Sequence, residues 1–197
     1  MKVIALAALA ATAGLATANP IAVGQFAGNT VDNAGTATGT IIVDISGYQS
    51  WDEQGNALNE ILTVALGVGA EMTGIGWDVN LTTFGGSWAS EAVMNFGGQL
   101  FLTPGVADGF SVSNQNYNSG GILDLSDNGI PNTLPDASGN LDIEFFESFV
   151  DNAGAPDSIW EAGSTLTLVG FGGNFVPTPG SLAVLGLGGL VAGRRRR

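Results

Sequence analysis

The feature that most constrains the fold of this chain is a period-two alternation of apolar and polar side chains. The clearest case is residues 75–81, where small or polar residues separate four apolar ones: Ile75, Trp77, Val79 and Leu81. Residues 62–68 and 141–145 repeat the pattern. Successive side chains of a β-strand point to opposite faces, so the pattern indicates strands with one buried and one wet face. Trp77 is expected in the core.

Further strands are expected in the apolar or β-branched runs of the middle of the chain, at 40–45, 92–96, 99–103, 121–125 and 164–171. The segments between them are rich in Gly, Asn, Asp and Ser, which favour turns. About seven to nine short strands joined by such turns predict an all-β protein, an antiparallel β-sandwich with jelly-roll-like connectivity. We assign this body to residues 19–175.

Positive charge is confined to the two ends of the chain. All 18 acidic residues lie between Asp32 and Glu161, whereas the 5 basic residues are Lys2 and Arg194–Arg197. The body therefore carries carboxylates with no cationic side chain among them. It is expected to be soluble and self-repelling, or alternatively to have its carboxylates bridged by divalent cations. Nucleic acid is excluded as a partner, because phosphate contacts require Lys and Arg.

The composition also limits the chemistry that the body can perform. The chain has no His and no Cys, which excludes Ser-His-Asp and Cys-His catalysis and His-based zinc sites. A glycosidase with two carboxylates is still compatible with it. Strand alternation places Glu144 and Glu147 on opposite faces, so Asp142 and Glu144 are the better pair. Plain solvent-facing acids are the favoured interpretation, and we expect no enzyme activity.

The N-terminal segment has the features of a secretory signal peptide. Lys2 precedes an apolar run at 3–15, and Ala16 and Ala18 form a small-x-small cleavage pattern. We predict a signal helix over 1–18, export by the Sec machinery and cleavage after Ala18. A single membrane anchor is the alternative, but the run is shorter than the roughly 20 residues that span a bilayer.

The C-terminal segment combines a proline motif, an apolar run and a basic cluster. Val176, Pro177, Thr178 and Pro179 precede an uncharged segment at 180–193, and Arg194, Arg195, Arg196 and Arg197 follow it. As a helix this segment rises about 21 Å, less than the ~30 Å of the hydrocarbon core. Basic residues beside an apolar segment stay on the cytoplasmic side. The tail is therefore expected to be a short apolar helix that stops transiently in the membrane.

These features resemble the PEP-CTERM sorting signal, a Pro-x-Pro motif followed by an apolar helix and terminal arginines. The tail departs from the family at Thr178, where the family name implies Glu. The resemblance implies an exosortase-type processing enzyme as partner, transient anchoring in the inner membrane through 176–197, and a final place at the cell surface or outside the cell. An ordinary C-terminal anchor is the alternative.

One stretch of the body offers oxygen ligands of the kind that calcium prefers. They are carboxylate and amide side chains: Asp124, Asp127, Asn128, Asp136, Asn140 and Asp142. Their spacing does not match an EF-hand, and Asx turns that cap loop ends are the alternative. No other cofactor is expected.

Two tryptophans are candidates for stacking on sugar rings. Trp51 and Trp88 lie beside turn-like residues, where partial exposure is expected. A role in the core or at its rim is the alternative. The sequence thus predicts an exported bacterial surface or extracellular-matrix protein with a structural or adhesive role. The alternatives are a carbohydrate-binding module of the extracellular polysaccharide matrix and, more distantly, the glycosidase with a carboxylate pair.

Overall fold

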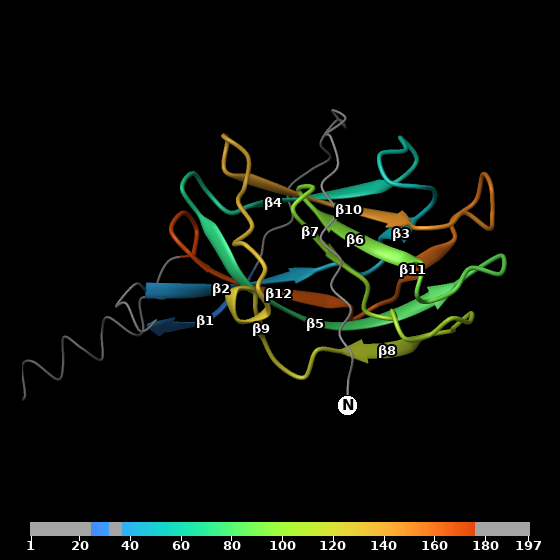
Figure 1. Ribbon diagram of the computed structural model, residues 1–197, viewed down its shortest axis with the longest axis horizontal. Coiled ribbons are helices and arrows are strands. Elements are labelled where there is room, and N and C mark those ends of the chain that lie inside the picture. The colour runs from blue at the N-terminus through green and yellow to red at the C-terminus, as the bar shows by residue number, and fades with distance from the viewer. Residues whose placement is uncertain (1–24, 32–36, 176–197) are drawn as a thin grey trace, which may run out of the picture.

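The computed structural model describes residues 25–31 and 37–175, which form two antiparallel β-sheets. Figure 1 shows the sheets as two layers, one above the other. The predicted all-β class is therefore confirmed, and the arrangement is that of a β-sandwich. The predicted signal helix, the proline motif, the apolar helix and the arginine cluster lie outside the described residues.

The larger sheet is built around one long central strand, β5 (Glu71–Thr83). Its strand order is β1 (Gln25–Val31), β2 (Ala37–Asp44), β12 (Thr165–Phe171), β5, β11 (Ser158–Trp160) and β3 (Gln49–Ser50). Two further strands also pair with β5: β8 (Gln115–Asn118) and β9 (Leu123–Asp124). A single turn of 3₁₀ helix, η1 (Ser126–Asn128), follows β9.

The smaller sheet has four strands in the order β4 (Glu60–Ala65), β10 (Asn140–Glu147), β6 (Ala92–Phe96) and β7 (Leu100–Leu102). The chain crosses between the layers repeatedly, since β4 and β6 belong to this sheet and β5 to the other.

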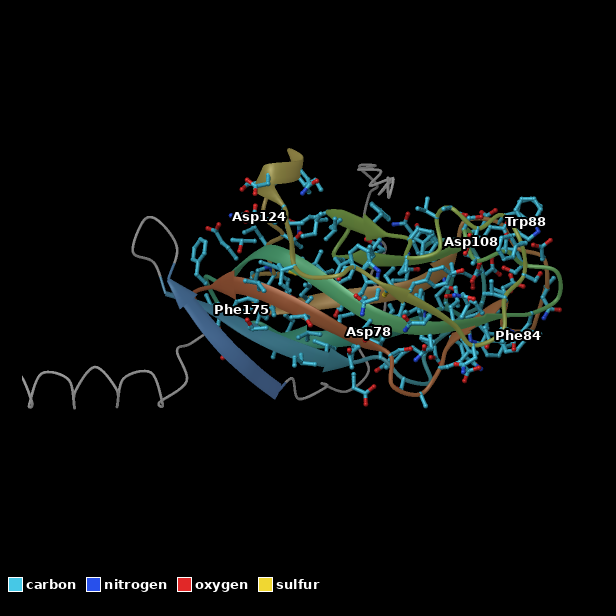
Figure 2. All side chains as sticks on the ribbon, turned by 90° about the horizontal axis from the view of Figure 1, so that it is seen from below. Asp78, Phe84, Trp88, Asp108, Asp124 and Phe175 are labelled. Atoms are coloured by element: carbon cyan, nitrogen blue, oxygen red, sulfur yellow. The ribbon has the colours of Figure 1, made fainter. Side chains whose placement is uncertain are left out.

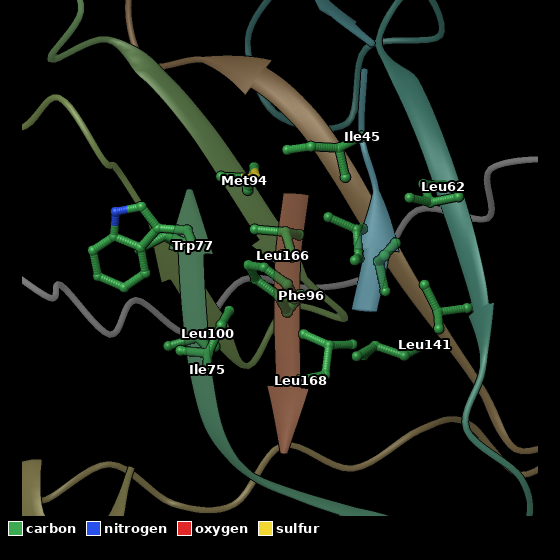
Figure 3. Close-up of a cluster of buried hydrophobic side chains, with 14 of the residues drawn as sticks. Ile45, Leu62, Ile75, Trp77, Met94, Phe96, Leu100, Leu141, Leu166 and Leu168 are labelled. Carbon is green, nitrogen blue, oxygen red and sulfur yellow. The ribbon is translucent and has the colours of Figure 1, made fainter. Parts of the chain in front are cut away.

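The core lies between the two sheets and follows the alternation read from the sequence. Ile75, Val79 and Leu81 of β5 have no exposed surface, and Trp77 is 8% exposed. Figure 3 shows such side chains from both sheets meeting in one cluster. Full burial of a side chain of this size contributes about 1.5–3 kcal/mol, so burial of its apolar face fixes the orientation of a strand such as β5.

Four observed strands carry no alternation that predicts them: β1, β3, β8 and β11. The strand β8 reads Gln-Asn-Tyr-Asn and is mostly exposed, and β3 has only two residues. Pairing with β11 holds β3 in place, and pairing with β5 holds β8 in place. The expectation that the alternation at 62–68 continues to Val68 is wrong. β4 ends at Ala65, and Val68 is 74% exposed between two glycines with positive φ.

Candidate functional site

Three loops meet at one end of the sandwich, and backbone hydrogen bonds tie them together. They span 84–91, 103–114 and 148–157, and we call this surface the aromatic end. The Phe84 N–H donates to the Asp157 carbonyl at 2.7 Å, and the Ala89 N–H donates to the Phe110 carbonyl at 3.1 Å. These bonds join loops that are far apart in the sequence, so the end behaves as one surface.

Four aromatic side chains are exposed on these loops: Phe84 (37%), Trp88 (48%), Phe110 (56%) and Phe149 (60%). Figure 2 shows Phe84 and Trp88 at one end of the molecule, with Asp124 and Phe175 toward the other. Among residues 39–175, the other large apolar side chains that are exposed are aliphatic: Leu58, Val68, Ile122 and Leu134. A concentration of exposed apolar side chains is typical of an interaction site.

Two carboxylates are fixed beside these aromatics. Glu91 Oε2 accepts the backbone N–H of Trp88 at 2.8 Å. The Tyr117 hydroxyl donates to Asp108 Oδ2 at 2.7 Å, and the burial of Tyr117 together with this bond raises the pKa of its phenol. The aromatic end therefore presents hydrogen-bond acceptors at set positions, next to flat apolar rings.

A buried acid lies beneath the loop that carries Trp88. Glu147 has no exposed surface. Its Oε1 accepts the Ser158 hydroxyl at 2.6 Å, and its Oε2 lies 3.2 Å from Ser87 Oγ. Ser87 Oγ also lies 3.4 Å from Glu91 Oε2. A chain of polar contacts thus runs from the interior to the surface loop.

The electrostatics of this buried network are unusual. Burial raises the pKa of Glu147 to about 8. The hydrogen bond from Ser158 lowers this pKa in part, and the negative charge of the nearby Asp157 raises it further. Burial also raises the pKa of Asp157. Residues 3–193 contain no Lys, Arg or His, so no side chain of the body can pair with either acid as a cation. Without a cationic partner, the buried Glu147 holds its proton to a higher pH than an exposed glutamate does.

Asp142 and Glu144, the candidate pair for a glycosidase, share the outer face of β10. Glu147 lies on the opposite face of the strand, as alternation requires. Asp142 accepts the Thr63 hydroxyl from the neighbouring strand. Glu144 accepts three N–H groups, from the Gly55 backbone at 2.6 Å, Asn59 at 3.0 Å and Asn95 at 3.3 Å. Glu144 therefore fastens the 53–59 loop to the sheet, and both carboxylates are occupied by partners.

The candidate calcium ligands are engaged in local turns. Asp124 Oδ1 accepts the Ser126 hydroxyl at 2.7 Å, a contact that lowers the pKa of Asp124, and it also accepts the Asp127 N–H at 3.1 Å. The Asn128 side-chain amide donates to the Asp124 carbonyl at 2.8 Å.

A second turn holds the next two candidates. Asp136 Oδ1 accepts the N–H groups of Ser138 and Asn140 at 2.8 and 2.9 Å. Within 25–31 and 37–175, no three acidic side chains are placed to hold a metal ion together. The structure therefore brings Asp124 together with Asp127 and Asn128, and Asp136 with Asn140, each in its own turn. Calcium binding stays a prediction.

The two candidate tryptophans lie in different environments. Trp88 is half exposed, but Trp51 is half buried, and its indole Nε1 is buried without a hydrogen-bond partner in the described part of the chain. The aromatic pairs found among these residues are Tyr48–Phe145, Phe101–Phe146 and Phe145–Trp160, none of which joins the two.

The three exposed phenylalanines that accompany Trp88 are not among the site residues expected from the sequence. Each stands in a polar or glycine-containing stretch where an apolar side chain has no strand to bury it: Phe84-Gly-Gly, Gly-Phe110-Ser and Ser-Phe149-Val-Asp. A phenylalanine in such a stretch, outside any expected strand, is the sequence feature that could have indicated its exposure.

A shallow hollow of about 180 Å³ lies elsewhere, where the connection between β8 and β9 crosses β5. Glycines of β5 allow this close approach, since a Cβ on Gly76 would lie 3.0 Å from the Gly121 carbonyl oxygen. Ligand pockets usually measure roughly 300–1,000 Å³, so this hollow is small for a ligand. The aromatic end is the stronger candidate site.

The described residues thus define an all-β protein of two sheets with an exposed aromatic end. None of their helical segments has the length and apolar character needed to cross a membrane. No protein-family model, curated protein or solved structure matches the chain. The residues of the aromatic end are therefore the observations that bear on function.

Proposed function

We propose that this chain is an exported bacterial protein of the cell surface or extracellular matrix, with a non-enzymatic adhesive role. The observation that carries the proposal is the exposure of four aromatic side chains on three loops tied together at one end of a sandwich. Exposed rings on loops held by a rigid scaffold are typical of binding surfaces. The lack of His, Cys and body cations supports a role other than catalysis.

We also propose jelly-roll connectivity for the body. The strand orders β2-β12-β5-β8 and β4-β10-β6-β7 support it, because the chain alternates between these two sets as two Greek keys would require. Lectin domains are among the proteins built on jelly rolls. That analogy is at the level of the fold alone.

The two ends supply the proposed route to the surface. A signal peptide at 1–18 directs Sec export, and the PEP-CTERM-like tail at 176–197 holds the chain in the inner membrane until an exosortase-type enzyme removes it. Replacing Arg194–Arg197 with Ser is expected to abolish normal processing, whereas replacement with Lys retains it because the positive charge is kept. Cell fractionation and the mass of the product report the result. Normal processing of the Ser variant would contradict the sorting proposal.

Carbohydrate binding is the second candidate function, and the aromatic end favours it. Aromatic rings present flat apolar faces to a sugar, and Glu91 and Asp108 lie beside them as acceptors for hydroxyl groups. The body has no cation to attract an acidic polymer. The matched polymer is therefore a neutral polysaccharide of the extracellular matrix, bound by Trp88 and its neighbours rather than by a Trp51–Trp88 pair.

A retention assay tests this candidate with the full-length protein. Dextran and cellulose serve as neutral polymers, and alginate serves as an acidic one. Trp88→Ala is expected to weaken retention on a neutral polymer by about tenfold or more, the size of one lost aromatic contact. Val68→Ser, which removes an exposed apolar side chain from a different turn, is the control and should bind normally. Stronger binding to alginate, or full retention by Trp88→Ala, would contradict this assignment.

A further inference from the structure

We propose that the proton held by Glu147 controls the loop that presents Trp88, so that this loop is ordered while Glu147 is neutral and loosens when it ionises. The inference rests on the proposed function for its biological meaning, since it describes how the aromatic end would be regulated. Its structural content depends only on the buried network beneath that end.

One hydroxyl hydrogen, that of Ser87, is shared between two carboxylates. Ser87 Oγ lies 3.2 Å from Glu147 Oε2 and 3.4 Å from Glu91 Oε2. When Glu147 is neutral, its own O–H donates to Ser87 Oγ, and the Ser87 hydrogen is free for Glu91. When Glu147 is ionised, two carboxylates compete for that single hydrogen, because a hydroxyl has one donor.

The residues around Glu147 provide no positive charge to stabilise its ionised carboxylate. Asp157, just before β11, and Glu91, on the β5–β6 loop, both act on this network as negative charges. The segment after β3 offers Glu147 only the Asp52 carbonyl, which accepts the Glu147 backbone N–H. No basic residue stands between positions 3 and 193. A buried carboxylate with only like charges nearby holds its proton, and burial accordingly raises the pKa of Glu147 to about 8.

Glu91 links the ionisation of Glu147 to the exposed loop that carries Trp88. Glu91 Oε2 accepts both the Ser87 hydroxyl and the Trp88 N–H. An ionised Glu147 accepts the Ser87 hydroxyl hydrogen and repels the Glu91 carboxylate. The hydrogen bond from the Trp88 N–H to Glu91 therefore weakens. The loop keeps its bonds from the Ser87 N–H to the Phe84 carbonyl and from the Ser111 hydroxyl to the Ser87 carbonyl. It therefore loosens around Trp88 rather than unfolding.

Hydrogen–deuterium exchange of the full-length protein tests this directly, with rates corrected for the intrinsic effect of pH. For a pKa of about 8, the neutral fraction of Glu147 falls from about 99% at pH 6 to about 9% at pH 9. The protection of the Trp88 amide should therefore fall about tenfold between these pH values. In Glu147→Gln the amide donates to Ser87 at every pH, so protection should stay high throughout.

Two further variants complete the test. Glu144→Gln changes an acid on the outer face of the same strand and should show the wild-type fall. Ser87→Ala removes the shared donor and should give low protection of Trp88 at both pH values, which keeps the proposal testable should Glu147→Gln fail to fold. An equal fall in Glu147→Gln, or none in the wild type, would overturn the proposal. No ligand enters this measurement, so its outcome is separate from that of the Trp88→Ala retention assay.

Discussion

The aromatic end and the acidic turns at 124–142 both contain carboxylates, but they hold them in opposite ways. In the turns, Asp124 and Asp136 are exposed and accept hydrogen bonds from residues two to four positions further along the chain. At the aromatic end, Glu147 is fully buried, and one of its partners, Ser87, lies 60 positions away. A dense acidic sequence therefore marks local turn chemistry, while the acid with the perturbed pKa arises where distant segments converge.

The largest expected effect concerns the pH dependence of stability at Glu147. Its carboxyl ionises near its ordinary pKa of 4.5 in the unfolded chain but holds its proton to a pKa of about 8 when folded. Between these values the unfolded state releases a proton that the folded state keeps. The Glu147 contribution is thus intact below pH 4.5 and declines as the pH rises to 8, by on the order of 3–5 kcal/mol.

Urea unfolding of wild type and Glu147→Gln across pH 4–9 isolates this contribution. Other acids also titrate, and hydrogen bonding lowers the pKa of Asp44 and Asp124, so only the difference between the two proteins is diagnostic. The variant should gain on the wild type steadily from pH 4.5 to 8. A constant difference across this range would show that Glu147 ionises normally in the folded protein, which would remove the contrast between the two regions.

A second, smaller effect is expected at Glu144, a buried acid whose partners are N–H groups. Glu144→Ala leaves the donors of Gly55, Asn59 and Asn95 without their acceptor. The loss should be about 2–3 kcal/mol, as for hydrogen bonds to a charged group. Unfolding by urea at pH 7 measures it, with Glu144→Gln as the conservative control that retains one acceptor oxygen. A loss below that of an exposed turn residue would contradict the role of Glu144 in fastening the 53–59 loop.

A third effect is expected in the acidic turns, and it should be modest. Asp136→Ala removes the acceptor of the Ser138 and Asn140 N–H groups, both of which remain exposed to water. The expected loss is about 1 kcal/mol, because water replaces the missing partner. Asp136→Asn keeps a side-chain acceptor and should lose less. A loss as large as that of Glu144→Ala would indicate that the turn has more than a capping role.

The smallest expected effect is that of metal removal on the same turns. Their carboxylates already accept local donors, so treatment with a chelator should leave the melting temperature within about 1 °C of the untreated protein. Differential scanning calorimetry with and without added calcium measures this. A calcium-dependent rise that Asp124→Asn abolishes would reverse the comparison and establish the predicted calcium site.

The strands that bury an apolar face were predictable, since burial of side chains such as Ile75 and Leu81 depends on a local period of two. The strands β3, β8 and β11 were not, because pairing with strands distant in sequence defines them. The same distinction holds for the candidate site. Trp88 stood out as a tryptophan beside a turn, whereas Phe84, Phe110 and Phe149 form a site only because three loops meet.

The sequence by itself determined the all-β class, the alternation of the core and a body without a single basic side chain. It also determined that Glu144 and Glu147 face opposite ways, because three residues along a strand reverse the direction of the side chain. Only the tertiary structure decided which partners these two acids meet. Both are buried, but Glu144 accepts N–H groups from three residues, whereas Glu147 lies beside two hydroxyls and neighbouring acids. Because no cationic side chain is present to stabilise the Glu147 carboxylate, burial raises the pKa of Glu147.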